Sequence, residues 1–388
     1  MTECKPILNT GLRGFSVATT KISDVDGARG KLLYRGYLAK DLAGKTSFEE
    51  VAYLLHYERL PSEAELAAFD ISLKKERAVP AAVIAALENM PKESLPMDVL
   101  QASVSMLANY DPDIQISSRE ASTRMSMRLI AKLSTLCAAW DRIRKDKKPV
   151  APSEQLSHAA NFLYMLNDEI PDDELASFFD AALVLHAEHS FNASTFTARQ
   201  VASTKAHMYA SISGAVGSLS GGLHGGANTR VMKMLLDIAA TGTVEDYVKN
   251  ILETGGVIMG LGHAVYQVDD PRAHILAPMS KKMGERVGDA TWHDLSKELE
   301  KKGKAAFKEK KGKDIFVNVD FYSASLYYYM GISLDIFTPI FAISRIAGWT
   351  AHVIEEQFAG ASSKPVLYRP ESEYIGEYCG PEECSLDR

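Results

Sequence analysis

The chain has 388 residues, a length that predicts about two domains, or one large helical domain with an inserted lobe. Hydrophobic residues make up 46% and charged residues 24% of the chain, the usual mixture of a globular protein, which excludes a wholly disordered chain. The net charge is −7 and no basic run dominates the sequence, so nucleic acid is not expected as the main partner.

In chain order, the first regular element is a short strand predicted at residues 31–37, the clearest of few alternating patterns. Capping boxes follow at Ser47–Glu50 and Ser62–Glu65, and each predicts the start of a helix. Residues 171–174 place a proline and acidic side chains in a first helical turn. Further helical spacing is found at residues 244–252 and 343–354. The sequence therefore predicts a mostly helical, all-α fold.

Four cysteines occur in the chain, Cys4, Cys137, Cys379 and Cys384. They form no CxxC pair and no metal-binding spacing, so free thiols in a reducing cytoplasm are expected. The first residues contain no apolar signal core. The most apolar stretch, residues 321–349, is interrupted by Asp335 and Arg345, so no membrane span is expected. These features favour a soluble, cytoplasmic protein with no membrane partner.

Two glycine-rich clusters, residues 218–227 and 255–262, interrupt the helical pattern. Glycine tolerates backbone rotations that other residues do not, so these clusters suit hinges. We therefore expect residues 1–222 and 323–388 to form a large helical domain and residues 223–322 to form a smaller inserted domain.

Three residues stand out because catalytic side-chain types lie in glycine-rich or apolar surroundings. His224 lies between glycines, His263 follows Gly-Leu-Gly, and Asp320 follows an apolar run. Two histidines and a carboxylate suit proton transfer combined with stabilisation of an oxyanion. Desolvation is expected to raise the pKa of Asp320 and make it a better base. Taken singly, each also fits a structural role, as a packed histidine or as an Asn-Val-Asp turn.

A zinc site is the competing chemical interpretation. His186 and His189 are three residues apart, which suits one helical face, but no HxxxH or HxxEH motif is present. The sequence therefore predicts no metal.

The passages around His224, His263 and Asp320, in this order and spacing, resemble the Si-type citrate synthase family, which includes the 2-methylcitrate synthases. The resemblance runs from about residue 10 to about residue 377. Further stretches that carry it are residues 22–27, 33–37, 156–163, 186–196, 343–349 and 368–370.

This resemblance implies an almost entirely helical homodimer with shared active sites, whose large domain serves dimerisation and oxaloacetate binding. It implies that the small domain binds CoA and carries catalytic residues. Asp320 is expected to remove a proton from the methyl group of acetyl-CoA while His224 hydrogen-bonds the thioester oxygen. His263 is expected to polarise the oxaloacetate carbonyl, and citryl-CoA is then hydrolysed. No permanently bound cofactor is implied, because the CoA thioester is a co-substrate.

The family pattern also implies a set of binding residues. His189, Arg272 and Arg345 match oxaloacetate ligands, Arg369 is expected to reach in from the other subunit, and Phe341 matches a residue of the acetyl pocket. Arginine suits this role because guanidinium groups grip carboxylates through two hydrogen bonds. The implied CoA contacts are Met259, Gly260, Leu261 and Gly262 near the adenine, Asn318 near the pantetheine, and Lys311 and Lys313 at the phosphates. The two lysines equally suit a solvated basic loop.

Departures from the family pattern lie on the CoA side. Ala264 and Gln267 stand where many members have cations, and Ala324 replaces a commoner glycine. A hydrophobic pocket discriminates one methylene by only about 1–3 kcal/mol, so propionyl-CoA stays open beside acetyl-CoA. The alternatives are therefore 2-methylcitrate synthase activity or dual activity, and, in a different class, a non-catalytic protein that binds a dicarboxylate or CoA. The three intact catalytic positions argue against the last.

Overall fold

The computed structural model describes residues 10–12 and 14–376. Within them the chain is helical apart from one small antiparallel sheet, ordered β1 (Ser23–Asp26), β2 (Lys31–Tyr34) and β3 (Tyr37–Leu38). The all-α fold class is thereby confirmed.

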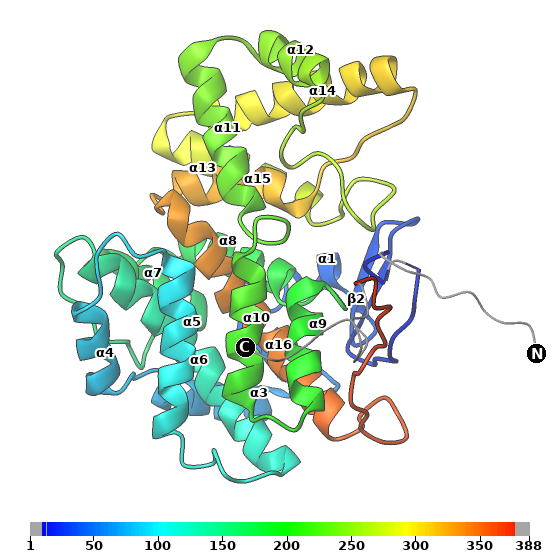
Figure 1. The fold of residues 1–388 in the computed structure, drawn as a ribbon. Helices are drawn as coiled ribbons and strands as arrows, with labels where there is room; N and C mark the ends of the chain where they lie inside the picture. Colours follow the sequence, from blue (N-terminus) through cyan, green and yellow to red (C-terminus); the bar gives the residue numbers. More distant parts are fainter. Residues whose placement is uncertain (1–9, 13, 377–388) are drawn as a thin grey trace, which may run out of the picture.

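The helices fall into two groups (Figure 1). The larger group contains α1 (Ala39–Leu42), α2 (Phe48–Tyr57), α3 (Glu63–Lys75), α4 (Ala81–Glu88), α5 (Pro96–Leu107), α6 (Arg119–Ile143), α7 (His158–Asn167), α8 (Asp173–His186), α9 (Ala193–Ser203), α10 (Met208–Ser220) and α16 (Phe337–Gln357). The smaller group contains α11 (Ala227–Thr241), α12 (Val244–Thr254), α13 (Ala273–Val287), α14 (Thr291–Lys311) and α15 (Val319–Tyr329). Two short 3-10 helices, Ala108–Tyr110 and Leu334–Ile336, complete the set among the described residues.

Local sequence signals explain where several elements begin. Both predicted capping boxes form, with Ser47 capping α2 and Ser62 capping α3. The prediction of one strand at residues 31–37 was wrong about the number of strands, because the chain turns at Arg35 and Gly36. Both residues have positive φ angles, 46° and 90°, and the segment becomes two paired strands of a hairpin.

Helix α16 forms the centre of the larger group. Its side chains are buried along almost its whole length, and it packs against α6, α8, α9 and α10. Trp349 has no exposed surface. Burying such an apolar helix on all sides is what stabilises a core of this size. Arg345 lies within this helix and is therefore held in a rigid, buried position.

The smaller group lies at one end of the molecule (Figure 1). The chain enters it after α10 through the first glycine cluster and leaves it after α15. Helix α15 packs against α13 and α11 and therefore belongs to the smaller group. The boundary predicted at residue 322 falls inside this helix, which continues to Tyr329. The division into two domains stays a prediction.

Two further findings bear on the sequence expectations. No helix in residues 10–12 and 14–376 is both long and apolar enough to cross a bilayer. Cys137 is buried with a free thiol, whereas Cys4, Cys379 and Cys384 lie outside the described residues.

Candidate active site

Five segments supply the candidate site residues. His189 follows α8, His224 lies between α10 and α11, and His263 lies between α12 and α13. Asp320 occupies the first turn of α15, and Arg345 lies in α16. The rings of His189 and His263 have centroids 5.4 Å apart. The charge of Arg345 acts on His189, His224 and Asp320 alike. The fold thus gathers residues that are up to 156 positions apart in sequence, from His189 to Arg345.

The geometry around His224 determines which ring nitrogen carries the proton. The backbone N–H of Ser194 donates to Nε2 of His224 at 3.1 Å. A nitrogen that accepts a hydrogen bond has a free lone pair, so the proton of the neutral ring lies on Nδ1. The Ser194 hydroxyl lies 2.8 Å from the same Nε2 and accepts a hydrogen bond from Trp349. Burial, with a smaller contribution from Arg345, lowers the pKa of His224 to about 4, so the ring is a neutral donor at pH 7.

His263 is fixed in the opposite tautomer. Its Nδ1 accepts the backbone N–H groups of Val265 and Tyr266, at 3.0 and 3.1 Å. The proton of the neutral ring therefore lies on Nε2. Burial, followed by the charge of Arg272, lowers the pKa of His263 to about 4. The loop is held in place by the backbone N–H of Gln267, which donates to Gly27 O at 2.8 Å.

Asp320 is a carboxylate with a raised pKa at the start of α15. Burial raises its pKa to about 6, although Arg272 opposes this shift, in the direction that the sequence indicated. Asn318 caps the helix by accepting the Asp320 N–H at 3.0 Å, and its amide donates to Gly262 O at 3.0 Å. Asn318 therefore links Asp320 to the glycine turn.

The two buried arginines of the candidate site, Arg272 and Arg345, have different partners. Arg272 donates through Nε and Nη2 to Asp270, at 2.9 and 2.7 Å. Arg345 donates through Nε to the backbone oxygen of His186 at 2.7 Å, and its guanidinium lies 4.7 Å from the ring centroid of Phe341. Burial lowers the pKa of Arg345 to about 10, whereas the pKa of Arg272 is raised because Asp270 outweighs its burial.

His189 completes the buried cluster. It is only 8% exposed, and its Nε2 has no hydrogen-bond partner among the described residues. Burial lowers its pKa well below the usual range, and both Arg272 and Arg345 act in the same direction. A neutral histidine beside two guanidinium groups suits a ligand with carboxylates.

The glycine turn at residues 259–262 depends on its glycines. Gly260 has φ 80°, and a Cβ there would lie 2.5 Å from the ring of Phe321 and 2.9 Å from Val231. Gly262 has φ 97°. Such positive φ angles favour glycine. The turn pairs with the segment before α15 through a bridge between Leu261 and Val317.

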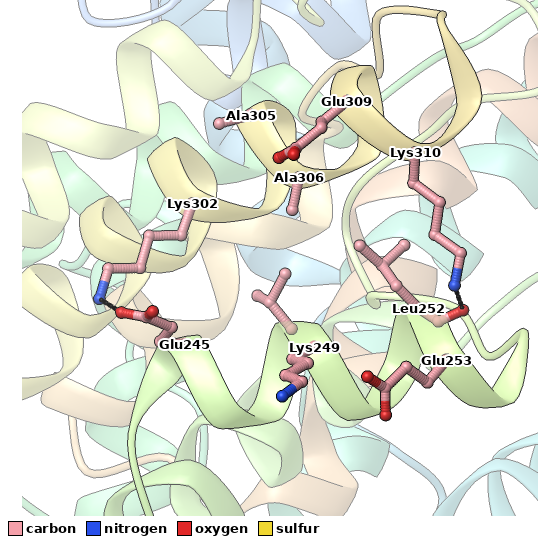
Figure 2. A pocket seen from close by; sticks show the side chains of 10 residues that line it. Glu245, Lys249, Leu252, Glu253, Lys302, Ala305, Ala306, Glu309 and Lys310 are labelled. Carbon is pink, nitrogen blue, oxygen red and sulfur yellow. Dashed lines mark hydrogen bonds and ion pairs between the residues drawn. The ribbon is translucent and has the colours of Figure 1, made fainter.

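Other predicted residues lie apart from this cluster. Arg369 is exposed on the segment that follows α16, and Lys311 and Lys313 are exposed at the end of α14. A groove of about 670 Å³ between α12 and α14 is lined by apolar and charged side chains, including Leu252, Glu253 and Lys302 (Figure 2). None of the predicted site residues lines that groove.

Three supporting residues were given no role from the sequence alone. Ser194 and Tyr266 donate the backbone hydrogen bonds that fix the two histidines, and Asp270 balances Arg272. The Asp-Pro-Arg spacing at residues 270–272 is a usable signal, because the acidic and the basic side chain are two positions apart in one turn. Ser194 offers no such signal, since it contacts His224 only through the fold.

Comparison with known proteins identifies relatives over almost the whole chain. Residues 11–371 match the family model described as "Citrate synthase, C-terminal domain". The citrate synthase of Haloferax volcanii is 44% identical over 375 residues, which are 95% of this chain and 96% of that protein. The 2-methylcitrate synthase of Shewanella oneidensis is 38% identical, covering 97% of each chain.

Two solved structures that are similar to this chain are also of citrate synthases. Citrate synthase from Pyrobaculum aerophilum has a TM-score of 0.86 at 36% identity, covering 96% of this chain and 95% of that chain. The enzyme from Thermoplasma acidophilum has a TM-score of 0.87 at 29% identity, covering 96% and 98%. Its structure is a ternary complex with carboxymethyl coenzyme A and oxaloacetate.

Proposed function

Because this chain belongs to the citrate synthase family, we propose specific roles for its site residues in the family reaction. The protein is an acyltransferase that condenses acetyl-CoA with oxaloacetate and hydrolyses citryl-CoA to citrate and CoA. The observation that carries the proposed roles is the pair of histidines held as neutral donors on opposite ring nitrogens, together with Asp320, whose pKa is near 6.

The first step is formation of an enol-like species, an enolate whose oxygen stays hydrogen-bonded to His224. The carboxylate of Asp320 takes a proton from the methyl carbon of acetyl-CoA, and the electron pair moves toward the thioester oxygen. His224 donates its Nδ1 proton in a hydrogen bond to that oxygen. Base and donor must act together, because a free carbanion is far less stable than an enol. The Ser194 N–H supports this role by keeping Nε2 an acceptor.

The second step forms the carbon–carbon bond. The enol carbon attacks the keto carbon of oxaloacetate, and the carbonyl electrons move onto its oxygen. His263 stabilises that developing oxyanion through Nε2–H, the tautomer that its backbone partners impose. Water then adds to the thioester of citryl-CoA, and the CoA thiol leaves as citrate forms.

Oxaloacetate binding falls to His189, Arg272 and Arg345 in this proposal. The support is their shared burial and the two guanidinium charges that act on His189. Arg369 completes the site from a second subunit of a homodimer, which fits its exposure in the single chain. The protein requires no permanently bound cofactor in this scheme, and we place it in the cytoplasm because Cys137 is a buried free thiol.

The CoA thioester is assigned to the smaller group of helices. The turn Met259, Gly260, Leu261 and Gly262 takes the adenine side, and Asn318 takes the pantetheine side. Lys311 and Lys313 supply exposed phosphate contacts. Phe341 and Ala324 border the acyl group, and Ala324 is fully buried on α15. Acetyl-CoA is the proposed preferred thioester, with propionyl-CoA, the substrate of a 2-methylcitrate synthase, as the close alternative.

The test measures release of free CoA thiol from the purified protein with oxaloacetate, in parallel with acetyl-CoA and propionyl-CoA. A larger kcat/KM for acetyl-CoA is expected, and a larger value for propionyl-CoA would assign the chain to the alternative. Asp320→Asn should abolish thiol release while oxaloacetate still protects the protein against thermal unfolding. Equal thiol release by Asp320→Asn would contradict the role of Asp320 as the base.

A further inference from the structure

Tyr266 is a buried side chain whose hydroxyl the proposed mechanism does not use. It is only 4% exposed, and its hydroxyl has no hydrogen-bond partner among the described residues. Buried hydroxyl groups without partners are costly and uncommon, so such a group within a ligand site points to a missing polar partner.

The surroundings of Tyr266 are those of the candidate oxaloacetate site. Its ring centroid lies 4.7 Å from that of His263 and 5.6 Å from that of His189. The charges of Arg272 and Asp270 both act on its phenol. His189 has an unpartnered Nε2 in the same cluster. Two adjacent rings therefore each carry a polar atom without a partner among the described residues, and the charge of Arg272 acts on both groups.

A second tyrosine in the same region shows the contrast. The hydroxyl of Tyr34 donates to Leu185 O at 3.1 Å and accepts the N–H of Glu188 at 3.3 Å. Its hydrogen-bonding capacity is used within the protein, as expected for a structural tyrosine. Tyr266 lies in the same buried region, with its own donor unused.

We propose that the Tyr266 hydroxyl donates a hydrogen bond to the oxaloacetate carboxylate that Arg272 holds. The side chain then has two roles, because its backbone N–H orients His263 and its phenol binds the substrate. This inference rests on the proposed function and adds a substrate ligand to it. Burial keeps the pKa of Tyr266 above its usual value, so the phenol is a proton donor throughout the neutral range.

Tyr266→Phe removes only the hydroxyl and leaves the backbone N–H that fixes His263. A hydrogen bond to a charged group contributes enough that its loss should weaken oxaloacetate binding about ten-fold. The dissociation constant is measured by titration of oxaloacetate without acyl-CoA, and KM is measured for both substrates. We expect KM for oxaloacetate to rise about ten-fold while KM for acetyl-CoA stays unchanged. The melting temperature without ligand should stay the same or rise.

Tyr209→Phe is the matched control. Its hydroxyl donates to Asp111 at 2.6 Å, outside the site, so this variant should lose thermal stability and keep its oxaloacetate affinity. A Tyr266→Phe variant that binds oxaloacetate within two-fold (about 0.4 kcal/mol) of the wild-type protein would overturn the proposal.

The binding titration separates this inference from the proposed function. Wild-type protein that binds oxaloacetate but releases no thiol would contradict the proposed function and still allow Tyr266 to be tested. Normal turnover with an unaltered Tyr266→Phe titration would show that the Tyr266 hydroxyl does not bind oxaloacetate and would leave the proposed function standing.

Discussion

The two buried arginines of the site are embedded in opposite ways. Arg272 lies beside Asp270 and forms an ion pair with it through two guanidinium nitrogens. Arg345 is equally buried, yet it forms no ion pair with a carboxylate in the described part of the chain and donates to a backbone oxygen instead. One positive charge is therefore balanced within the protein, and the other is not.

This difference assigns the two arginines different energetic roles. Placing a charge in a buried site costs several kcal/mol unless a partner compensates it. Arg272 has that partner before any ligand binds. The charge of Arg345 is partly offset at longer range by Glu188, so a bound carboxylate completes its compensation. Arg345 should therefore contribute most to affinity for a dicarboxylate, whereas Asp270 and Arg272 should contribute most to stability.

Removing the unbalanced charge should have the largest effect on activity. Arg345→Gln is expected to lower kcat/KM for oxaloacetate by about 10³-fold, equivalent to roughly 4 kcal/mol, because a buried charge pair with the substrate is lost. Stability should not fall, since the variant no longer buries an uncompensated guanidinium. Steady-state kinetics and thermal unfolding measure the two effects. A variant with near-normal kinetics and a much lower melting temperature would reverse the comparison.

Removing the balancing acid should give the complementary result. Asp270→Asn leaves Arg272 buried without its carboxylate, which should cost about 3 kcal/mol of unfolding free energy. Oxaloacetate should then raise the melting temperature more than in the wild-type protein, because its carboxylate replaces the lost charge. Denaturant unfolding with and without oxaloacetate tests both statements. If Asp270→Asn matches the wild-type free energy, Asp270 does not compensate Arg272.

Features that depend on a short stretch of sequence could be predicted before the structure was known. His224, His263 and Asp320 could be singled out because each lies in a short, unusual local setting, and their catalytic roles stay a prediction. Capping boxes were predictable for the same reason, since all their hydrogen bonds fall within one turn. The hairpin turn at Arg35 was not predictable, because an arginine with a positive φ angle contradicts local preference.

The electrostatic setting of the site depended on the fold. The sequence does not show whether Arg345 lies beside a carboxylate, because its neighbours come from helices that are distant from α16 in the chain. The tautomer of His224 depends on Ser194, 30 residues earlier in the chain, and nothing near either residue signals the contact. The residue types of the site and the raised pKa of Asp320 could thus be predicted, whereas the tautomers of His224 and His263 could not.

The charges of Arg272 and Arg345 both change the pKa of Asp320, and the pH dependence of turnover measures the pKa that results from these charges and from burial. Each arginine lowers the pKa of Asp320, but burial outweighs them and leaves it at about 6. The proposed mechanism requires Asp320 to be ionised as the base, so kcat/KM should fall about ten-fold between pH 7 and pH 5. His224 and His263, with pKa values of about 4, stay neutral donors over that interval.

Stability linked to Asp320 changes in the other direction. Because its folded pKa lies above the unfolded value, Asp320 binds protons more readily in the folded protein, and lowering the pH from 7 toward 5 stabilises the fold through this group. The fall in kcat/KM between pH 7 and pH 5 should therefore be reversible, and it should not be accompanied by a fall in the melting temperature that is due to Asp320. Rate measurements from pH 5 to pH 8, with unfolding curves at each pH, test this separation. Constant kcat/KM down to pH 5 would mean that the charges of Arg272 and Arg345 outweigh burial at Asp320.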